Sequence, residues 1–453
     1  MPEFELHCCR EATGDKKVFY YNSETSNLFH HDRSPVSIPD MEFDPKSQVV
    51  DITPTDYNMC VHKPSFDNPG RKDSNSIFKL KIQLGLRCNN SCGYCLQGSL
   101  SNRDRQSIPL DEFVSLIPDS VGHFQWWGGE PFLYWDILKP LAEMVRAKYP
   151  DAAFYMPTNG LLLDYEKNEW LDKTGFCISV SHDGPGQWVR GKDPLKDQDN
   201  LAIIQNLFTR LSNRGRFSFN PTISKKNASR KVINDWFIKE VGHNNFHLGE
   251  GAFFHPCGPE HEEFCLSTHQ EEVDYRLMML FELRSEAFRN MGLIYEKTES
   301  FKYSFYIHRR WDVLRQMCAT DRPDILCVDL SGNILTCQNM SADGFTHNGV
   351  SHIIGNMRNI GAARLNTITH WWHVDACREC PVVQICLGGC PSTPPSVWTL
   401  FCKNSFSDNI PIFAHAIEQL TGYLPYYIEG DQREDRKDIF DIIKNGEEDH
   451  VFI

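Results

Sequence analysis

The sequence predicts an α/β protein that contains a partial (β/α)6 barrel with a cysteine-rich extension. Three observations lead to this prediction: strand and helix patterns alternate from residue 78 to residue 248, three closely spaced cysteines follow the first strand, and a longer cysteine series follows the last. Alternation of this kind is typical of a parallel sheet with crossover helices. In β/α barrels the active site lies at the carboxyl ends of the strands, so the first cysteines are expected there.

The expected strands have alternating or continuous apolar residues. They are residues 78–84, 124–127, 152–156, 176–180, 217–219 and 245–248. Apolar residues at spacings of three and four predict helices between them. These helices lie around residues 137–145, 201–211 and 232–237.

Composition limits the classes of partner. The 453 residues are enough for two or three domains, and the formal charge of −14 argues against nucleic acid as the main partner. No stretch approaches the roughly 20 apolar residues that span a bilayer, so no membrane partner is expected. The 17 cysteines occur in spaced clusters, and the N-terminus has no basic region followed by an apolar run. Metal-bound thiolates in a reducing cytoplasm are therefore favoured over disulfides.

The first cysteine group has the spacing C-x3-C-x2-C, formed by Cys88, Cys92 and Cys95. A [4Fe–4S] cube normally takes four cysteines, so three thiolates would leave one iron open for chemistry. A zinc knuckle and three unrelated thiols are the alternatives. The run from Leu86 to Cys95 resembles the cluster loop of the radical S-adenosylmethionine (radical SAM) enzymes. The resemblance implies that SAM chelates the open iron and is cleaved to a 5'-deoxyadenosyl radical by one electron from the cluster.

Other segments resemble the SAM contacts of the same family. Tyr94 matches the aromatic residue that lies against the adenine, and Gly128-Gly129-Glu130-Pro131 resembles the motif whose backbone and glutamate hold the SAM amino group. The resemblance also implies contacts from Asn159 and Ser181, which follow the third and fourth strands. Arg190 is a candidate for the SAM carboxylate, whereas His182 is expected to be structural.

The second cysteine series matches the arrangement of the SPASM extension, which is named from maturases of peptides and proteins. Such extensions usually bind two auxiliary [4Fe–4S] clusters, so the resemblance implies three clusters in all. One auxiliary cluster would take Cys318, Cys327, Cys337 and Cys390. The other would take Cys377, Cys380, Cys386 and Cys402. A zinc ribbon is the alternative, since C-x2-C pairs are also zinc spacings, and Cys327 is the ligand that another group could replace.

Four parts follow from these patterns. Residues 1–75 form an N-terminal extension with a β-hairpin at residues 18–29, a candidate for recognition of a substrate peptide, although a packed extension of the catalytic domain is favoured. Residues 76–300 form the radical SAM core and residues 301–409 the SPASM domain. Residues 410–453 are expected to form a helical, charged tail.

Three functions compete. The favoured one is a maturase that takes a hydrogen atom from a ribosomally synthesised precursor peptide. Its reaction would be the formation of a crosslink or a thioether, the epimerisation of a residue, or the excision of part of the backbone. The second is an anaerobic sulfatase-maturing dehydrogenase that makes formylglycine. The third, a non-catalytic iron–sulfur electron carrier, is weakest because the SAM motifs would have no purpose.

The residue after Cys337 separates the first two functions. The sulfatase-maturing enzymes carry an aspartate there, which serves as the base, whereas this chain has Gln338. An amide cannot accept that proton. Expected partners of the maturase are the precursor peptide, an electron donor such as flavodoxin or ferredoxin, and a separate peptide-recognition protein.

Overall fold

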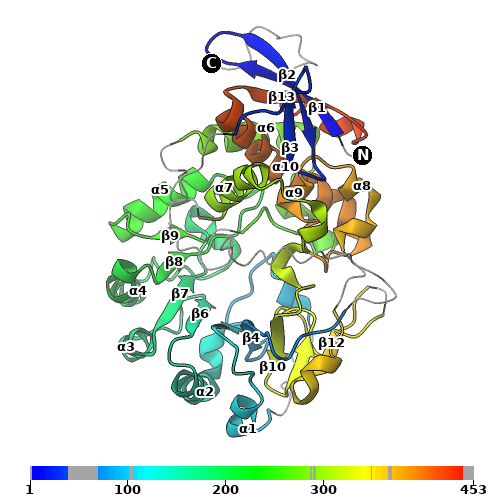
Figure 1. Cartoon of the computed structure of the whole chain (residues 1–453). Coiled ribbons are helices and arrows are strands. Elements are labelled where there is room, and N and C mark those ends of the chain that lie inside the picture. Colours follow the sequence, from blue (N-terminus) through cyan, green and yellow to red (C-terminus); the bar gives the residue numbers. More distant parts are fainter. Residues whose placement is uncertain are drawn as a thin grey trace.

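The computed structural model describes residues 3–38, 70–100, 107–249, 251–285, 288, 292–347, 349–365 and 370–441. Nine strands of these residues form one large sheet, in the order β12-β11-β10-β4-β5-β6-β7-β8-β9 (Figure 1). From β4 to β9 the neighbouring strands all run parallel. A four-stranded sheet, in the order β13-β1-β2-β3, lies at the end of the molecule that holds both termini.

The six predicted barrel strands are confirmed as β4 to β9. Their bounds are Lys79–Gln83, His123–Trp127, Ala153–Thr158, Phe176–Val180, Phe217–Phe219 and His247–Leu248. The predicted helices correspond to α2 (Trp135–Lys148), α4 (Gln198–Leu211) and α5 (Arg230–Val241). The mixed α/β fold with its parallel sheet is therefore as the sequence predicts.

Alternate residues of the first barrel strand, β4, have different surroundings. Leu80 and Ile82 belong to the main hydrophobic core. Gln83 is also buried, but its side-chain amide donates to the carbonyls of Gln338 and Met340, at 2.7 and 2.9 Å. Because side chains alternate across a strand, one face of β4 packs in the core while the other carries polar groups.

Within the barrel segment, residues 78–248, two helices were not predicted, α1 (Leu110–Ser115) and α3 (Tyr165–Thr174). Helix α3 begins where the Asp164 side chain accepts the Lys167 backbone N–H at 2.7 Å, and it ends at Gly175, whose φ is 82°. Its sequence is largely polar, and only Trp170 and Leu171 are buried large apolar residues. The helical period of apolar residues is consequently too weak to recognise.

The cysteine-rich extension shares the barrel sheet. Strand β10 (Ile325–Asp329) pairs parallel with β4, and β11 (Asn333–Leu335) and β12 (Ile353–Asn356) continue the sheet antiparallel. The predicted boundary at residues 300/301 is wrong because it falls inside α7 (Gly292–Tyr306). This helix places Ile294 in the barrel core and Phe301 in a second core, so it joins the two parts.

The terminal sheet confirms the predicted hairpin and adds two strands to it. Strands β2 (Asp15–Asn22) and β3 (Asn27–His30) form the hairpin, β1 (Glu3–Arg10) pairs with β2, and β13 (Leu424–Glu429) pairs antiparallel with β1. Residues 39–69 of the predicted N-terminal extension lie outside the described residues.

The predicted helical tail at residues 410–453 is helical only up to residue 421, and residues 442–453 lie outside the described residues. Helix α10 (Pro395–Thr421) already spans the expected boundary, and it ends at Gly422 with φ 76°. The next residues, Leu-Pro-Tyr-Tyr-Ile-Glu, are rich in aromatic and apolar side chains and form β13 instead.

The second hydrophobic core lies between the terminal sheet and the helices beneath it. Tyr21 of β2 packs against Phe413 of α10 and Phe305 of α7, with ring centroids 5.3 and 5.6 Å apart. Helix α6 (His269–Leu283) adds Leu280 to this core. Within the described part of the chain, no helix has the length and apolarity needed to cross a bilayer.

Candidate active site

The predicted cluster loop lies directly after β4, at the carboxyl end of the barrel strands. Cys88 is exposed, and Cys92 and Cys95 are half-buried. Burial raises the pKa of Cys92 to about 11, and negative charge on Cys95 and Cys88 raises it further. The three thiols therefore lie near one another and remain accessible, as a shared cluster with an open iron requires.

The Gly128-Gly129 turn is held against the cluster loop by backbone hydrogen bonds. The N–H of Gly129 donates to the carbonyl of Gly85 at 3.0 Å, and the N–H of Glu130 donates to that of Arg87 at 2.9 Å. A Cβ on Gly129 would lie 2.3 Å from the carbonyl oxygen of Arg87. Only glycine allows this approach. Pro131 then begins a short 3₁₀ turn, Pro131–Tyr134, and the Tyr134 hydroxyl accepts the Arg87 N–H at 2.8 Å.

Glu130 is buried and satisfied by protein donors. One carboxylate oxygen accepts from the Phe132 N–H at 3.1 Å and the Thr158 hydroxyl at 2.8 Å, and the other accepts from the Asn159 N–H at 2.8 Å. Desolvation raises its pKa to about 7, although these hydrogen bonds oppose the rise. In this arrangement Glu130 positions the turn after β6, and a ligand amino group would share its oxygens with these donors.

Asn159 connects that turn to the cluster loop. Its side-chain amide donates to the Asn89 side-chain oxygen at 2.7 Å and lies 4.0 Å from the Cys88 sulfur. Asn89 was not singled out from the sequence, because an asparagine between two cysteines has no distinguishing pattern. Glu130, Asn159 and Asn89 thus form a continuous polar link from β5 through β6 to the cysteines.

Asp183 is the second residue that sequence reasoning missed. Its carboxylate accepts from the Tyr94 hydroxyl, from Arg190 Nε at 2.8 Å and from the Thr222 N–H at 2.8 Å. The neighbouring Ser181 donates its backbone N–H to Thr158 at 2.7 Å. The sequence shows Asp183 only as part of a Ser-His-Asp-Gly-Pro turn, and its partners come from three distant segments. It fixes Tyr94 and Arg190 beside the cluster loop.

Two further features surround this loop. A cavity of about 370 Å³ is lined by Asn89, Asn90, Ser91, Leu161, Arg190, Gly191 and Lys192. His182 is fully buried, lies 2.8 Å from Asp193 and stacks on Trp236. Its position agrees with the structural role expected for it.

Four downstream cysteines come together around β10, and we call them the strand group: Cys318, Cys327, Cys337 and Cys390. Burial raises the pKa of Cys337, and negative charge on Cys327 and Cys318 adds to the effect. Burial likewise raises the pKa of Cys390 to about 11, with a contribution from Cys318. The set matches the first predicted ligand set, including the distant Cys390.

The strand group and the cluster loop each have a cysteine near Cys257. Burial raises the pKa of Cys257 to about 12, and negative charges on Cys390 and Cys95 contribute to the rise. The side-chain oxygen of Gln338 lies 3.5 Å from the Cys337 sulfur and 3.8 Å from that of Cys327. An amide therefore occupies the position beside the strand group.

The other four cysteines lie among short helices, and we call them the helix group: Cys377, Cys380, Cys386 and Cys402. They come from α8 (Asp375–Arg378), α9 (Val383–Cys386), α10 and the turn after α8. Burial raises the pKa of Cys377 well above its usual value, and charges on Cys386, Cys402 and Cys380 raise it further. The structure thus brings together the second predicted set as well.

Comparisons with known proteins support this description. Residues 82–190 match the Radical SAM superfamily. The chain is similar to anSMEcpe with bound AdoMet, at 18% identity and a TM-score of 0.54, over 75% of this chain and 98% of that one. It is also similar to native anSMEcpe with bound AdoMet and the Cp18Cys peptide, at 17% identity and a TM-score of 0.53, over 76% and 99%.

A more distant likeness is to Streptococcus suis SuiB bound to S-adenosylmethionine, at 15% identity and a TM-score of 0.45, over 70% of this chain and 73% of that one. No curated protein sequence matches the chain. The superfamily match begins at the end of β4 and covers the cluster loop, the Gly128-Gly129 turn and the segment up to Arg190. Since these are the parts that build the site, the chain contains a radical SAM domain.

Proposed function

We propose that this enzyme modifies a ribosomally synthesised peptide and that it holds three [4Fe–4S] clusters, one at the cluster loop and two auxiliary ones. The observation that carries the proposal is the gathering of eight downstream cysteines into two sets of four, of which one set and the cluster loop each have a cysteine near Cys257. Four thiolates are the usual ligand set of a complete cube.

The spacing of the sulfurs supports clusters over single zinc ions. Among the described residues, the set of three ligand atoms within 4.8 Å of one another is Glu5, His7 and Glu429, which includes no cysteine. A tetrahedral zinc ion with Zn–S bonds of about 2.3 Å would hold its sulfurs roughly 3.8 Å apart. A cube binds each thiolate to a different iron and so spreads them further apart.

The residues of the site would bind and orient the cofactor. When bound, SAM and its cluster supply a 5'-deoxyadenosyl radical that takes a hydrogen atom from the substrate. Cys88, Cys92 and Cys95 hold the cluster, while Glu130 and Asn159 fix the turn beside it. Arg190 brings a positive charge to the edge of the cavity that suits the SAM carboxylate, and Tyr94 closes the site near the loop.

A peptide substrate is supported by two observations. The anSMEcpe structure with a similar fold contains a bound peptide next to AdoMet. Cys257 also lies near both the strand group and the cluster loop. This arrangement would suit a substrate that loses a hydrogen atom to the 5'-deoxyadenosyl radical and then gives one electron to an auxiliary cluster. The reaction would draw electrons from a donor such as flavodoxin or ferredoxin, take place in the cytoplasm, and use a precursor peptide with or without a separate recognition protein.

Formylglycine formation is the second candidate, because the fold similarity to anSMEcpe favours it. Gln338 argues against it, since the amide beside Cys337 cannot take a proton from a cysteine or serine substrate. The two candidate functions therefore make different predictions for a substitution of Gln338.

Iron content tests the three-cluster proposal. Protein reconstituted without oxygen should carry about twelve irons and twelve sulfides per chain, as expected for three cubes. Replacing Cys88, Cys92 and Cys95 with alanine should remove about four of each and abolish SAM cleavage, whereas Cys9→Ala, which removes a half-buried thiol outside the groups, should change neither. Zinc in the helix group, or only about four irons in the wild type, would contradict the proposal.

The substrate class is tested with two peptides. Incubation with SAM and dithionite should modify a peptide encoded beside the gene, consuming SAM in step with product. A sulfatase-type peptide should give only slow, uncoupled 5'-deoxyadenosine. Gln338→Asp restores a carboxylate beside Cys337 and is the matched variant: it should gain formylglycine formation if this position alone blocks that reaction. Efficient formylglycine formation by the wild type would reject the maturase proposal.

A further inference from the structure

The C-terminal segment places a buried arginine on the helix group. Arg436 follows β13 in the turn Glu434–Arg436, and only 3% of it is exposed. One guanidinium nitrogen lies 3.1 Å from the Cys402 sulfur and another lies 3.6 Å from the Cys380 sulfur. Its guanidinium also lies over the ring of Phe406, 4.7 Å from the centroid.

A buried guanidinium needs a negative partner, because an isolated charge is strongly destabilised away from water. Within the described part of the chain, Arg436 forms no ion pair with a carboxylate. The adjacent Asp435 pairs with Arg433 at 2.6 Å instead. Burial alone would lower the pKa of Arg436, but negative charge on Cys380 and Cys402 outweighs it and raises the pKa.

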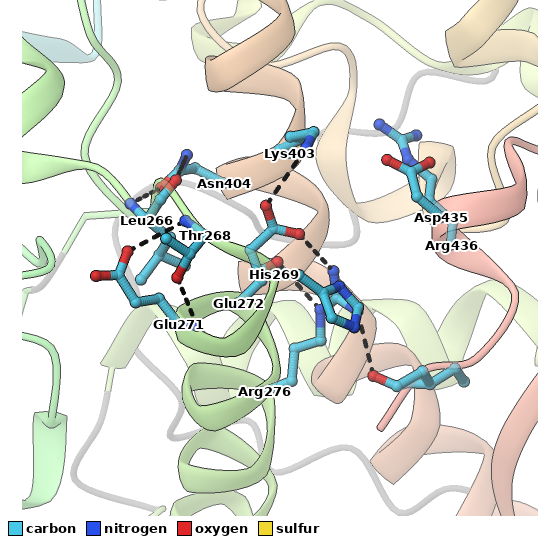
Figure 2. A network of polar contacts seen from close by, with 12 residues as sticks. Leu266, Thr268, His269, Glu271, Glu272, Arg276, Lys403, Asn404, Asp435 and Arg436 are labelled. Atoms are coloured by element: carbon cyan, nitrogen blue, oxygen red, sulfur yellow. Dashed lines mark hydrogen bonds and ion pairs between the residues drawn. The ribbon is translucent and has the colours of Figure 1, made fainter. Parts of the chain in front are cut away.

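The carboxylate of Glu272 is already engaged by other cations. Figure 2 shows Arg436 and Asp435 beside a network in which Glu272 accepts from Arg276 at 3.2 Å and faces Lys403 at 3.8 Å. Two cations therefore share this one carboxylate, and Glu272 forms no ion pair with Arg436. The sulfurs of Cys380 and Cys402 are the groups that the Arg436 guanidinium contacts.

We propose that Arg436 is a positioning residue that raises the reduction potential of the auxiliary cluster bound by the helix group. The inference rests on the proposed clusters. One-electron reduction adds negative charge to a cluster, and two N–H···S contacts from a fixed cation stabilise the reduced form more than the oxidised form. Hydrogen bonds to the sulfurs and the surrounding charge are among the factors that set such potentials. The strand group has the neutral Gln338 near two of its sulfurs.

The test measures the two auxiliary potentials in one protein. The background carries alanine at Cys88, Cys92 and Cys95, so the cluster-loop signal is absent, and EPR-monitored titration with dithionite follows the auxiliary clusters. Arg436→Met removes the charge and the donors, while Arg436→Lys keeps the charge but loses the two-pronged contact. Arg433→Met is the matched control, because it removes a more exposed arginine of the same segment that pairs with Asp435.

We expect Arg436→Met to lower the ratio of reduced to oxidised cluster at one auxiliary site about tenfold at a fixed potential, equivalent to 59 mV for one electron. Arg436→Lys should give a smaller shift in the same direction, and Arg433→Met none. The other auxiliary cluster should be unchanged and serves as the internal reference. If Arg436→Met loses about four irons while Arg436→Lys keeps them and shows the shift, the proposal also stands.

Other outcomes overturn it. Wild-type potentials in both Arg436 variants would show that the guanidinium does not tune the cluster. Loss of about four irons from both variants would make Arg436 an assembly residue instead. A wild-type protein without iron at the helix group would reject the proposed clusters themselves, and the iron analysis detects that failure before any titration.

Discussion

The strand group and the helix group have the same four-cysteine composition but opposite surroundings. The strand group is built partly on β10, which pairs with the first barrel strand, has a cysteine near Cys257 as the cluster loop does, and includes the exposed Cys318. The helix group lies between short helices and the terminal segment, with a buried cation on two of its sulfurs. Equal ligand sets can therefore serve different tasks, because position and nearby charge, rather than ligand count, distinguish them.

The largest expected effect separates the two groups by function. Cys327→Ala with Cys337→Ala, and Cys380→Ala with Cys402→Ala, should each remove about four of about twelve irons. The strand-group variant should form no peptide product even in a single turnover, because the proposed electron acceptor for the substrate radical would be missing. The helix-group variant should still form product in a single-turnover assay but should not form it over multiple turnovers. Equal behaviour in both assays would show that the difference in surroundings has no functional meaning.

Glu130, a buried acid beside the cluster loop, extends the comparison. Its partners are a hydroxyl and two backbone N–H groups, whereas Arg436 contacts two cysteine sulfurs. The folded-state pKa of Glu130, about 7, lies above the usual 4.5, so its stabilising contribution is complete below pH 4.5 and is lost as the pH rises through 7. The loss is about 3 kcal/mol, from the size of the shift. Urea unfolding at pH 4.5 and 8 should show it in the wild type and not in Glu130→Gln. A pH-independent difference between the two proteins would contradict this.

The same residue should influence SAM binding through the turn that it holds. Glu130→Ala removes the acceptor of three hydrogen bonds, two of them from Thr158 and Asn159. Losing hydrogen bonds to a charged group costs about 1.5–3 kcal/mol, so SAM affinity should fall roughly ten- to a hundred-fold. Equilibrium binding of SAM to the reconstituted protein measures this. Helix-group variants should retain wild-type affinity, and unchanged affinity in Glu130→Ala would remove the turn from the SAM site.

The smallest expected effect concerns the ring under Arg436. Phe406→Leu removes a cation–π contact worth about 1–2 kcal/mol when desolvated. Phe413→Leu is the matched control, because this ring of the same helix is buried against Tyr21 and Phe301. Both variants should lose packing energy, and Phe406→Leu should lose more. Equal unfolding free energies would show that the ring only fills space.

The sequence predicted the parts of this molecule whose signals are local. The six barrel strands follow from short-range alternation, and the two cysteine groups follow from the resemblance of the cysteine series to the SPASM extension. Asp183 and Arg436 could not be predicted, because their roles depend on partners far away in the chain, such as Tyr94 and Cys402. Strand β1 had a usable signal, the alternation of Phe4, Leu6 and Cys8, but its partner β13 was concealed by the expectation of a helical tail.

The pairing of β1 with β13 sets the order in which the protein can mature. Glu5 lies opposite Glu429, so β1 cannot pair with β13 until more than 400 further residues have been synthesised. At about 5–20 residues per second, that delay is roughly 20 to 80 seconds. The barrel strands and Cys88, Cys92 and Cys95 leave the ribosome well before Arg436 does. Insertion of the proposed helix-group cluster would therefore wait for this late segment, whereas the proposed cluster at the loop could receive its iron earlier in synthesis.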